Sequence, residues 1–323
     1  MSELAEFAGE VHRSFAAERP RKLTPVDYPA SCTNLYDVRA VICDVYGTLI
    51  DYWREEFNDP QSKVTALHRS FRAVAERFSM ADALMSINAA DPPEKTLCDF
   101  YHGLITLKHE QAARKKIRHP EIVIEEIWEF IIKLLGRHGY VCGDGDPARL
   151  HEEARKIAWY YNGYSLGRDL YPGVVASIAE LKKRGMVFGI VSNAQFYTPM
   201  DLTLMLRDQS SGKYDDFSEL FDVDLTFFSY EYRVAKPDRL LFRKLFDALY
   251  EFQILPQQTV FVGNDLAIDI APAQEAGMRT ALFTGDRRST FIHDLDGRVI
   301  PDLVFSGWNE LVDKLSLYSE GQS

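Results

Sequence analysis

The sequence predicts an α/β fold, in which a Rossmann-like doubly wound parallel sheet carries an all-helical insertion. Apolar runs typical of buried parallel strands, at 38–43, 187–191, 259–262 and 279–283, alternate with helical patterns. The segment 51–167, between the first two runs, shows only helical stripes. With 323 residues, of which 46% are hydrophobic, the chain is long enough for a large core and a second, smaller domain.

Residues 1–37 are expected to be a leader that precedes the sheet. Apolar residues follow helical spacing within residues 2–18, which predicts an amphipathic helix (Leu4, Phe7, Ala8, Val11 and Phe15). Three prolines between residues 20 and 29 then favour an extended chain. We expect the helix to pack against the rest of the chain, and a homodimer contact is the alternative.

The first strand, within residues 38–50, is predicted to end at a carboxylate. Asp44 follows the apolar run directly, and Tyr46, Gly47 and Thr48 predict a tight turn after it. Open α/β sheets bind their ligands at the carboxyl ends of the strands, so Asp44 is a candidate site residue. An aspartate that only caps the turn is the alternative.

The insertion 51–167 is expected to form several helices and no strand. Its last helix should begin with Asp146 as the cap and Pro147 at the first position. Arg54 lies just after the first strand, and it is a candidate ligand for an anionic group because arginine recognises carboxylate and phosphate.

Residues 168–323 are expected to complete a sheet of five or six strands. A helix that begins at Pro172, a strand near 222–226 and helices at 238–250, 267–276 and 308–316 fill the intervals between the apolar runs. No Gly-x-Gly-x-x-Gly pattern supports a dinucleotide. The polar residues that follow the strands or open a helix are Ser192, Asn193, Lys236, Asn264, Asp265 and Asp269.

The composition restricts the partners. A net charge of −11 argues against nucleic acid and against an anionic membrane surface, but a local lysine or arginine lining still allows a small anionic substrate. The four cysteines have no paired spacing, which indicates neither a disulfide framework nor a zinc site. No segment has the apolar length of a membrane span or of a signal peptide, so we expect a cytoplasmic protein.

Four stretches stand in the order, and at roughly the spacing, of the four motifs of the haloacid dehalogenase (HAD) superfamily. They are Asp44-x-Tyr-Gly-Thr48, Ser192-Asn193, Lys236 before Pro237, and Gly263-Asn-Asp followed by Asp269. The sequence therefore resembles a HAD hydrolase from about residue 38 to residue 316. The resemblance implies a HAD core formed by 38–50 and 168–323, with 51–167 as a helical cap that excludes water and selects the substrate.

The resemblance also implies roles for these residues. Asp44 would be the nucleophile and form a covalent intermediate that water cleaves. Thr48 and Ser192, with Asn193 beside it, would hydrogen-bond the carboxylate or the transferring group, and Lys236 would neutralise charge. Mg²⁺ would be held by Asp44, the Tyr46 carbonyl and Asp269, with Asn264 or Asp265 assisting.

Two departures from the family pattern point in opposite directions. Tyr46 stands where the phosphatases have a second aspartate that protonates the leaving oxygen, as in the 2-haloacid dehalogenases, whose halide leaving group needs no proton. Those dehalogenases work without metal, however, whereas Asn264, Asp265 and Asp269 keep the oxygen donors that Mg²⁺ prefers, although Asn264 replaces the usual aspartate. We expect Mg²⁺-dependent hydrolysis of a small phosphate ester. The alternatives are a metal-free carbon–halogen hydrolase like the 2-haloacid dehalogenases and a non-catalytic binding protein with the HAD fold.

Overall fold

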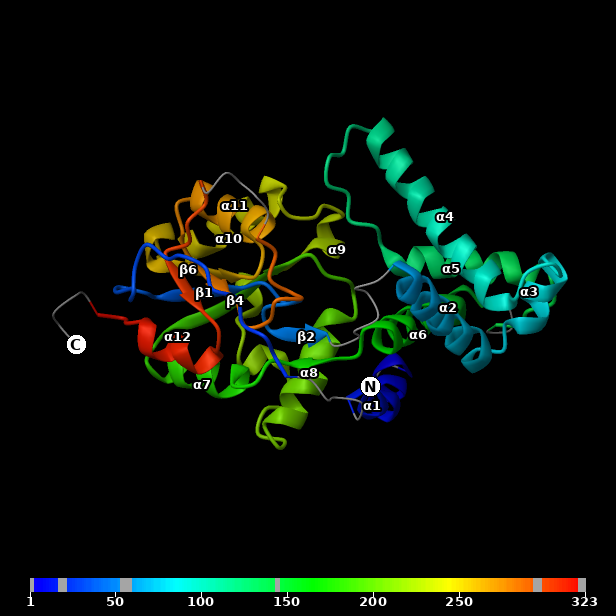
Figure 1. Cartoon of the computed structure of the whole chain (residues 1–323), viewed down its shortest axis with the longest axis horizontal. Coiled ribbons are helices and arrows are strands. Elements are labelled where there is room, and N and C mark those ends of the chain that lie inside the picture. The colour runs from blue at the N-terminus through cyan, green and yellow to red at the C-terminus, as the bar shows by residue number, and fades with distance from the viewer. Residues whose placement is uncertain (1–2, 17–21, 53–59, 143–145, 293–297, 319–323) are drawn as a thin grey trace. The chain divides into compact units, whose positions relative to one another are not determined.

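The computed structural model describes residues 3–16, 22–52, 60–142, 146–292 and 298–318 (Figure 1). The chain forms two compact units. One comprises residues 1–20 and 52–168, and the other comprises residues 21–51 and 169–323. The first unit is helical and the second is α/β. Among the helices described, none is long and apolar enough to span a membrane.

The α/β unit is built on a six-stranded sheet in the order β5-β4-β1-β6-β7-β8, and all neighbouring strands are parallel. In sequence order, the first strand of this sheet, β1, is central. The next two, β4 and β5, lie on one side of it, and the last three, β6, β7 and β8, lie on the other. This reversal is the topological switch point of a doubly wound sheet, so the predicted fold class is confirmed. The strands are β1 (Ala40–Cys43), β4 (Val187–Ser192), β5 (Thr226–Phe228), β6 (Thr259–Gly263), β7 (Arg279–Phe283) and β8 (Leu303–Phe305), while β2 (Ile50–Tyr52) and β3 (Arg168–Leu170) form a separate pair.

Helices cover both faces of the sheet. Along β1, Val41 and Cys43 face one hydrophobic core, and Ala40 and Ile42 face the other, because side chains alternate along a strand. The first core includes α7, α8 and α12, and the second includes α10 and α11. The helices of this unit are α7 (Val174–Lys183), α8 (Thr198–Gln209), α9 (Ser229–Tyr232), α10 (Arg239–Glu251), a π-helical turn (Leu266–Ile270), α11 (Ala271–Glu275) and α12 (Trp308–Lys314), with 3-10 turns at Phe217–Glu219, Val223–Leu225 and Pro256–Gln258.

The helical unit has an aromatic core. Phe71, Tyr101, Trp128 and Tyr161 lie within 6.4 Å of one another by ring centroids and join four of its helices. Asp146 caps the last helix by accepting a hydrogen bond from the Ala148 backbone N–H at 3.0 Å, as predicted. The helices are α1 (Glu3–Ala16), α2 (Pro60–Arg77), α3 (Ala81–Ile87), α4 (Pro93–Arg114), α5 (Ile124–Gly136) and α6 (Pro147–Leu166).

The predicted N-terminal helix is confirmed as α1, and its apolar side packs on α6. The Phe7 and Phe15 rings lie 5.8 and 5.6 Å from the Trp159 ring, and Lys156 Nζ forms an ion pair with Glu3 at 2.8 Å. The leader that follows belongs to the other unit. Within this leader the Cys32 N–H donates to the Asp302 carbonyl oxygen at 2.8 Å, beside the edge strand β8.

Five elements differ from the sequence-based expectation. The strands β2 and β3 were not predicted, and β2 (Ile50–Tyr52) includes two residues of the insertion that was expected to contain no strand. The strand predicted near 222–226 begins at Thr226, because Asp222 caps a 3-10 turn over Val223–Leu225. The helix predicted at 267–276 begins as the π-helical turn that Asp265 caps. The short edge strand β8 was not predicted.

Candidate active site

Asp44 lies at the carboxyl end of the central strand. Its backbone N–H donates to the Val262 carbonyl oxygen at 2.8 Å, which continues the pairing of β1 with β6. The register of β1 against β4 and β6 places Ser192 and Gly263 at the adjacent strand ends. Asp44 is 6% exposed. The parallel sheet therefore brings the polar residues that end three strands to one edge.

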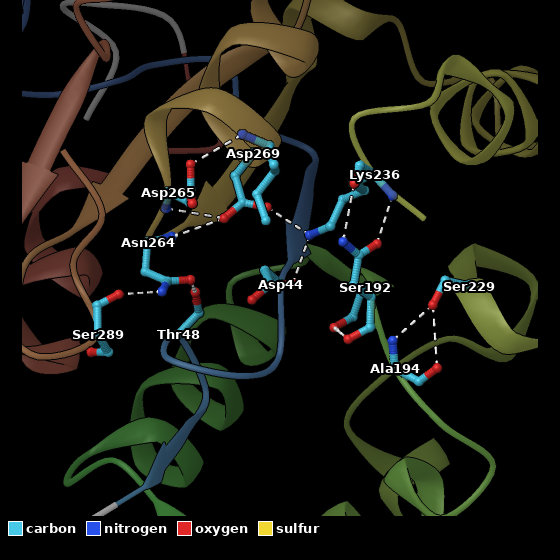
Figure 2. Close-up of polar contacts among 12 residues, drawn as sticks. Asp44, Thr48, Ser192, Ala194, Ser229, Lys236, Asn264, Asp265, Asp269 and Ser289 are labelled. Carbon is cyan, nitrogen blue, oxygen red and sulfur yellow. Dashed lines mark hydrogen bonds and ion pairs between the residues drawn. The ribbon is translucent and has the colours of Figure 1, made fainter. Parts of the chain in front are cut away.

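Lys236 lies between the Asp44 carboxylate, at the end of β1, and the Asp269 carboxylate, on the π-helical turn after β6, as Figure 2 shows. Its Nζ atom donates to Asp44 Oδ1 and to Asp269 Oδ1, both at 2.6 Å. The lysine side chain is fully buried, and those of Asp44 and Asp269 are 9% and 1% exposed. The predicted convergence of these three residues is confirmed, and their catalytic roles remain predictions.

Asp269 is fixed by the backbone that precedes it. Its Oδ2 atom accepts hydrogen bonds from the backbone N–H groups of Asn264 and Asp265, both at 3.1 Å. A Cβ atom at Gly263 would lie 2.4 Å from Asp269 Cβ, so this close approach requires glycine. The Asp265 Oδ1 atom accepts from the backbone N–H groups that start the π-helical turn, at 2.7 and 3.1 Å. Asp265 therefore positions the turn that carries Asp269.

Burial and charge crowding shape the titration of this cluster. Burial, and then the neighbouring carboxylates of Asp44 and Asp265, raise the pKa of Asp269 to about 7, against the opposing effect of Lys236. Burial alone would lower the pKa of Lys236, but its attraction to Asp269 and Asp44 outweighs burial and raises it. Asp44 and Asp269 thus share the charge of one ammonium group, and the Asp265 carboxylate lies near enough to raise the pKa of Asp269.

Asn193 holds the backbone of Lys236. Its Oδ1 atom accepts from the Lys236 N–H at 2.6 Å, and its Nδ2 atom donates to the Lys236 carbonyl oxygen at 3.1 Å. The Ser192 hydroxyl is fully buried and donates to the Asn193 carbonyl oxygen at 3.4 Å. Asn193 is therefore a positioning residue for Lys236, and a contact between Ser192 and a substrate remains a prediction.

Thr48 and Tyr46 have partners that the sequence did not indicate. The Thr48 hydroxyl donates to Asn264 Oδ1 at 2.9 Å, whereas the sequence suggested the Asp44 carboxylate or the transferring group as its partner. The Tyr46 hydroxyl forms a hydrogen bond with Thr198 Oγ1 at 2.9 Å.

Sequence reasoning missed several residues that support the site. The Ser289 carbonyl oxygen accepts from Asn264 Nδ2, as Figure 2 shows, and the Trp308 indole N–H donates to the Thr48 carbonyl oxygen at 3.0 Å. For Ser289, the available signal was its position in a polar stretch after the predicted strand 279–283. Arg54, the predicted substrate ligand, lies outside the described residues.

The donor set suits a hard cation that keeps water ligands. Asp44 and Asp269 provide carboxylate oxygens from the end of β1 and from the π-helical turn after β6, and Mg²⁺ commonly binds through one or two carboxylates plus water. Among the described residues, no cluster of three or more histidine, cysteine, aspartate or glutamate side chains is arranged to hold a metal by itself. Backbone oxygens and water would have to complete the shell.

Comparison with known proteins identifies relatives of the chain. A family model described as a haloacid dehalogenase-like hydrolase matches residues 38–277. Glyceraldehyde 3-phosphate phosphatase from Pyrococcus furiosus is 28% identical over 159 residues, which are 49% of this chain and 59% of that protein, so the chain covers less than two thirds of its length. A 2-haloacid dehalogenase from Pseudomonas syringae pv. Tomato DC3000 superposes with a TM-score of 0.52 at 18% identity, over 85% of this chain and 97% of that one. A HAD phosphatase from Thermococcus onnurineus superposes with a TM-score of 0.46 at 17% identity over the same shares.

Proposed function

Because the chain belongs to the haloacid dehalogenase-like hydrolases, we propose that it hydrolyses a small phosphate ester through a covalent intermediate on Asp44, with the help of Mg²⁺. The phosphatase relative from Pyrococcus furiosus supports the phosphate ester as the substrate class.

The observation that carries this proposal is the hydrogen bonding of the two oxygen atoms of the Asp44 carboxylate. Its Oδ1 atom accepts a hydrogen bond from Lys236, while Oδ2 accepts none from any residue that the structure describes. The residue as a whole is 6% exposed, so the carboxylate lies in a largely buried site. A carboxylate with one oxygen anchored and the other without a donor is oriented for nucleophilic attack.

The charge of the cluster supports a divalent cation. Asp44 and Asp269 would repel an anionic phosphate, and the Lys236 ammonium group that they share offsets only part of their charge. Asp44, the Tyr46 carbonyl and Asp269 would hold Mg²⁺, with Asp265 assisting directly or through water. When bound, Mg²⁺ supplies Lewis-acid stabilisation of the negative charge on the transferring group.

The reaction would proceed in two displacements at phosphorus. An Asp44 oxygen attacks the phosphorus, and the bond from phosphorus to the ester oxygen breaks, leaving its electron pair on that oxygen. Water then attacks the phosphorus of the aspartyl phosphate, and the bond between phosphorus and the Asp44 oxygen breaks, which releases phosphate and restores the carboxylate. The hydrogen bond from Lys236 to Oδ1 holds the Asp44 carboxylate in place for the first attack.

Tyr46 determines which leaving groups are suitable. No aspartate stands two residues after Asp44, so the proton for the leaving oxygen would come from the Tyr46 hydroxyl or from water. A phenol is a weak acid compared with a carboxyl group, because its ordinary pKa is about 10. We therefore expect substrates with acidic leaving groups, such as aryl phosphates or acyl phosphates, to react faster than alkyl phosphates.

Tyr46 also favours a second candidate function, which is carbon–halogen hydrolysis. An Asp44 oxygen would attack the carbon that carries the halogen, and halide would leave with the bonding electron pair and need no proton. Water would then attack the acyl carbon of the aspartyl ester, and the bond from that carbon to the substrate oxygen would break, which releases the 2-hydroxy acid and restores the carboxylate. The fold shared with the Pseudomonas syringae dehalogenase is compatible with this reaction but does not establish it.

A substrate panel with an isotope experiment separates these functions. Phosphate esters and 2-haloacids are assayed with and without Mg²⁺, with Asp44→Asn as the inactive variant and the exposed Asp215→Asn as its matched control. A single turnover in ¹⁸O-water should label the released phosphate if water attacks phosphorus, and the Asp44 carboxylate if water attacks an acyl carbon. Metal-independent turnover of haloacids alone would overturn the proposal, and no turnover of any compound would indicate a binding protein.

A further inference from the structure

The loop that follows β7 is bonded to the residues that follow β6. The Phe291 N–H donates to the Asn264 carbonyl oxygen at 2.9 Å, and the Leu266 N–H donates to the Phe291 carbonyl oxygen at 3.1 Å. The Ser289 carbonyl oxygen accepts from Asn264 Nδ2. Ser289 and Asn264 are both buried, so water does not compete well for these bonds. The loop therefore fixes the position of Asn264 through both its backbone carbonyl oxygen and its side-chain amide.

The partner at Ser289 decides which way the Asn264 amide faces. A backbone carbonyl oxygen can only accept, so the NH₂ group of Asn264 must lie on the Ser289 side. The amide oxygen then lies on the Thr48 side, where it accepts the Thr48 hydroxyl hydrogen at 2.9 Å. Because Thr48 has a single hydroxyl hydrogen, this hydroxyl can only accept from any further group. Ser289, Asn264 and Thr48 thus form a chain of hydrogen bonds with one direction.

The same amide also packs on the turn that follows the candidate nucleophile. A Cβ atom at Gly47 would lie 2.3 Å from Asn264 Nδ2 and 3.1 Å from Ser289 Cβ. Gly47 has a φ of +86°, so the turn needs glycine both for its backbone and for this contact. The turn is held on its other side by the hydrogen bond from Trp308 to the Thr48 carbonyl oxygen.

We propose that Asn264 is a positioning residue for the nucleophile and not a metal ligand, an inference that rests on the proposed function of Asp44. Asn264 holds the turn at Gly47 and Thr48 against the loop at Ser289, and this contact keeps Asp44 aligned with Lys236. The Asn264 amide oxygen already accepts the hydrogen bond from the Thr48 hydroxyl. Turning it towards a metal would leave the Thr48 hydroxyl and the Ser289 carbonyl without their partners in a buried site.

A double-mutant comparison tests whether Asn264 acts through Thr48. The proteins are the wild type, Asn264→Ala, Thr48→Val and the double variant. If the residues act as one unit, each single variant should lower kcat by about 10- to 100-fold, and the double variant should be no slower than the slower single variant. KM should change by less than about threefold. Losses of kcat that multiply would overturn the proposal, because they would show independent roles.

Two further variants separate positioning from general damage. Thr48→Ser keeps the hydroxyl and should retain kcat within about threefold of the wild type. Thr259→Val removes another fully buried hydroxyl at the opposite end of β6, where it bonds the Leu255 carbonyl oxygen, and kcat should be unchanged. A Thr48→Ser variant as slow as Thr48→Val would contradict the hydrogen-bond chain.

Metal binding provides a readout that does not depend on turnover. Calorimetric titration of Asn264→Ala with Mg²⁺ should give a Kd within about threefold of the wild type, whereas a loss of more than about tenfold would show that Asn264 acts on the metal. If the wild type hydrolyses only 2-haloacids, the proposed function fails, and the same kcat comparison on a 2-haloacid still decides the role of Asn264. Absence of turnover on both substrate classes would overturn both proposals.

Discussion

Replacing Lys236 with methionine removes the ammonium group that lies between the buried Asp44 and Asp269 carboxylates. Each N–O pair is 2.6 Å long, and at an effective dielectric constant of about 20 each contributes roughly 6 kcal/mol of attraction before desolvation is subtracted. Deleting one partner of a buried ion pair costs about 3 to 5 kcal/mol, because the remaining charge stays buried. We therefore expect Lys236→Met to lower the free energy of unfolding by about 3 to 5 kcal/mol at pH 8.

Lys95 provides a matched control, because it also bridges two carboxylates. Its Nζ atom lies 2.8 Å from Asp91 and 3.1 Å from Asp99, but the lysine side chain is 40% exposed. Surface ion pairs contribute at most about 1 kcal/mol, so Lys95→Met should cost no more than that. The comparison therefore isolates the effect of burial.

Urea unfolding of the wild type and both variants, followed by tryptophan fluorescence at pH 5 and pH 8, measures the two costs. Loss of Lys236 raises the pKa of Asp269 further above its value of about 7, so the carboxyl group takes up a proton at low pH and the cost of Lys236→Met should shrink. A cost at pH 8 no larger than that of Lys95→Met would refute the view that Lys236 neutralises a buried carboxylate pair.

Three other predictions test the site and the helical unit. Asp44→Asn should abolish turnover while the thermal midpoint stays the same or rises, because crowded carboxylates repel one another, and retained turnover would exclude covalent catalysis by Asp44. Relative to Asp269→Asn, the wild type should lose about 3 kcal/mol of stability as the pH rises from 4 to 7. The reason is that the pKa of Asp269 is about 7 in the folded protein, against an ordinary value of 3.8, so the folded state holds this proton more tightly than the unfolded state. The stabilisation that results is fully present below about pH 4 and is lost as the pH rises through 7. A difference in urea unfolding between the two proteins that does not change with pH would contradict this. Gly163→Ala should cost about 1 to 3 kcal/mol in thermal unfolding, because its Cβ would lie 2.6 Å from the Phe15 ring, whereas Gly103→Ala meets no atom within 4 Å and should be neutral or stabilising; equal effects would argue against the packing of α1 on α6.

The central part of the site could be predicted because strand ends are visible in the sequence. An apolar run that stops at Asp44 and another that stops before Asn264 indicate two carboxyl ends, and a parallel sheet aligns such ends at one edge. Lys236 and Asp269 could be placed with them from the order of the motifs. The close approach of Asp44, Lys236 and Asp269 could therefore be predicted from the sequence.

The hydrogen-bond partners of Thr48 and Asn264 could not be predicted from the sequence in the same way. The direction of the Asn264 amide depends on the carbonyl oxygen of Ser289, and a backbone group carries no signal in the sequence. The strand β8 has three residues, which is too short for periodicity to distinguish it from loop. The position of the leader depends on backbone bonds such as that from Cys32 to Asp302, which follow from no side-chain pattern.

The central position of β1 has a consequence for biosynthesis. This strand is synthesised before both of its sheet neighbours, which begin at Val187 and Thr259. Roughly 140 residues separate β1 from β4, so at about 5 to 20 residues per second the strand waits some 7 to 30 s for its first partner. The helical unit is complete by residue 168, before that partner emerges, and can fold during the delay. Val41 and Ile42, which are fully buried in the finished sheet, therefore have no neighbouring strand to pair with over this interval.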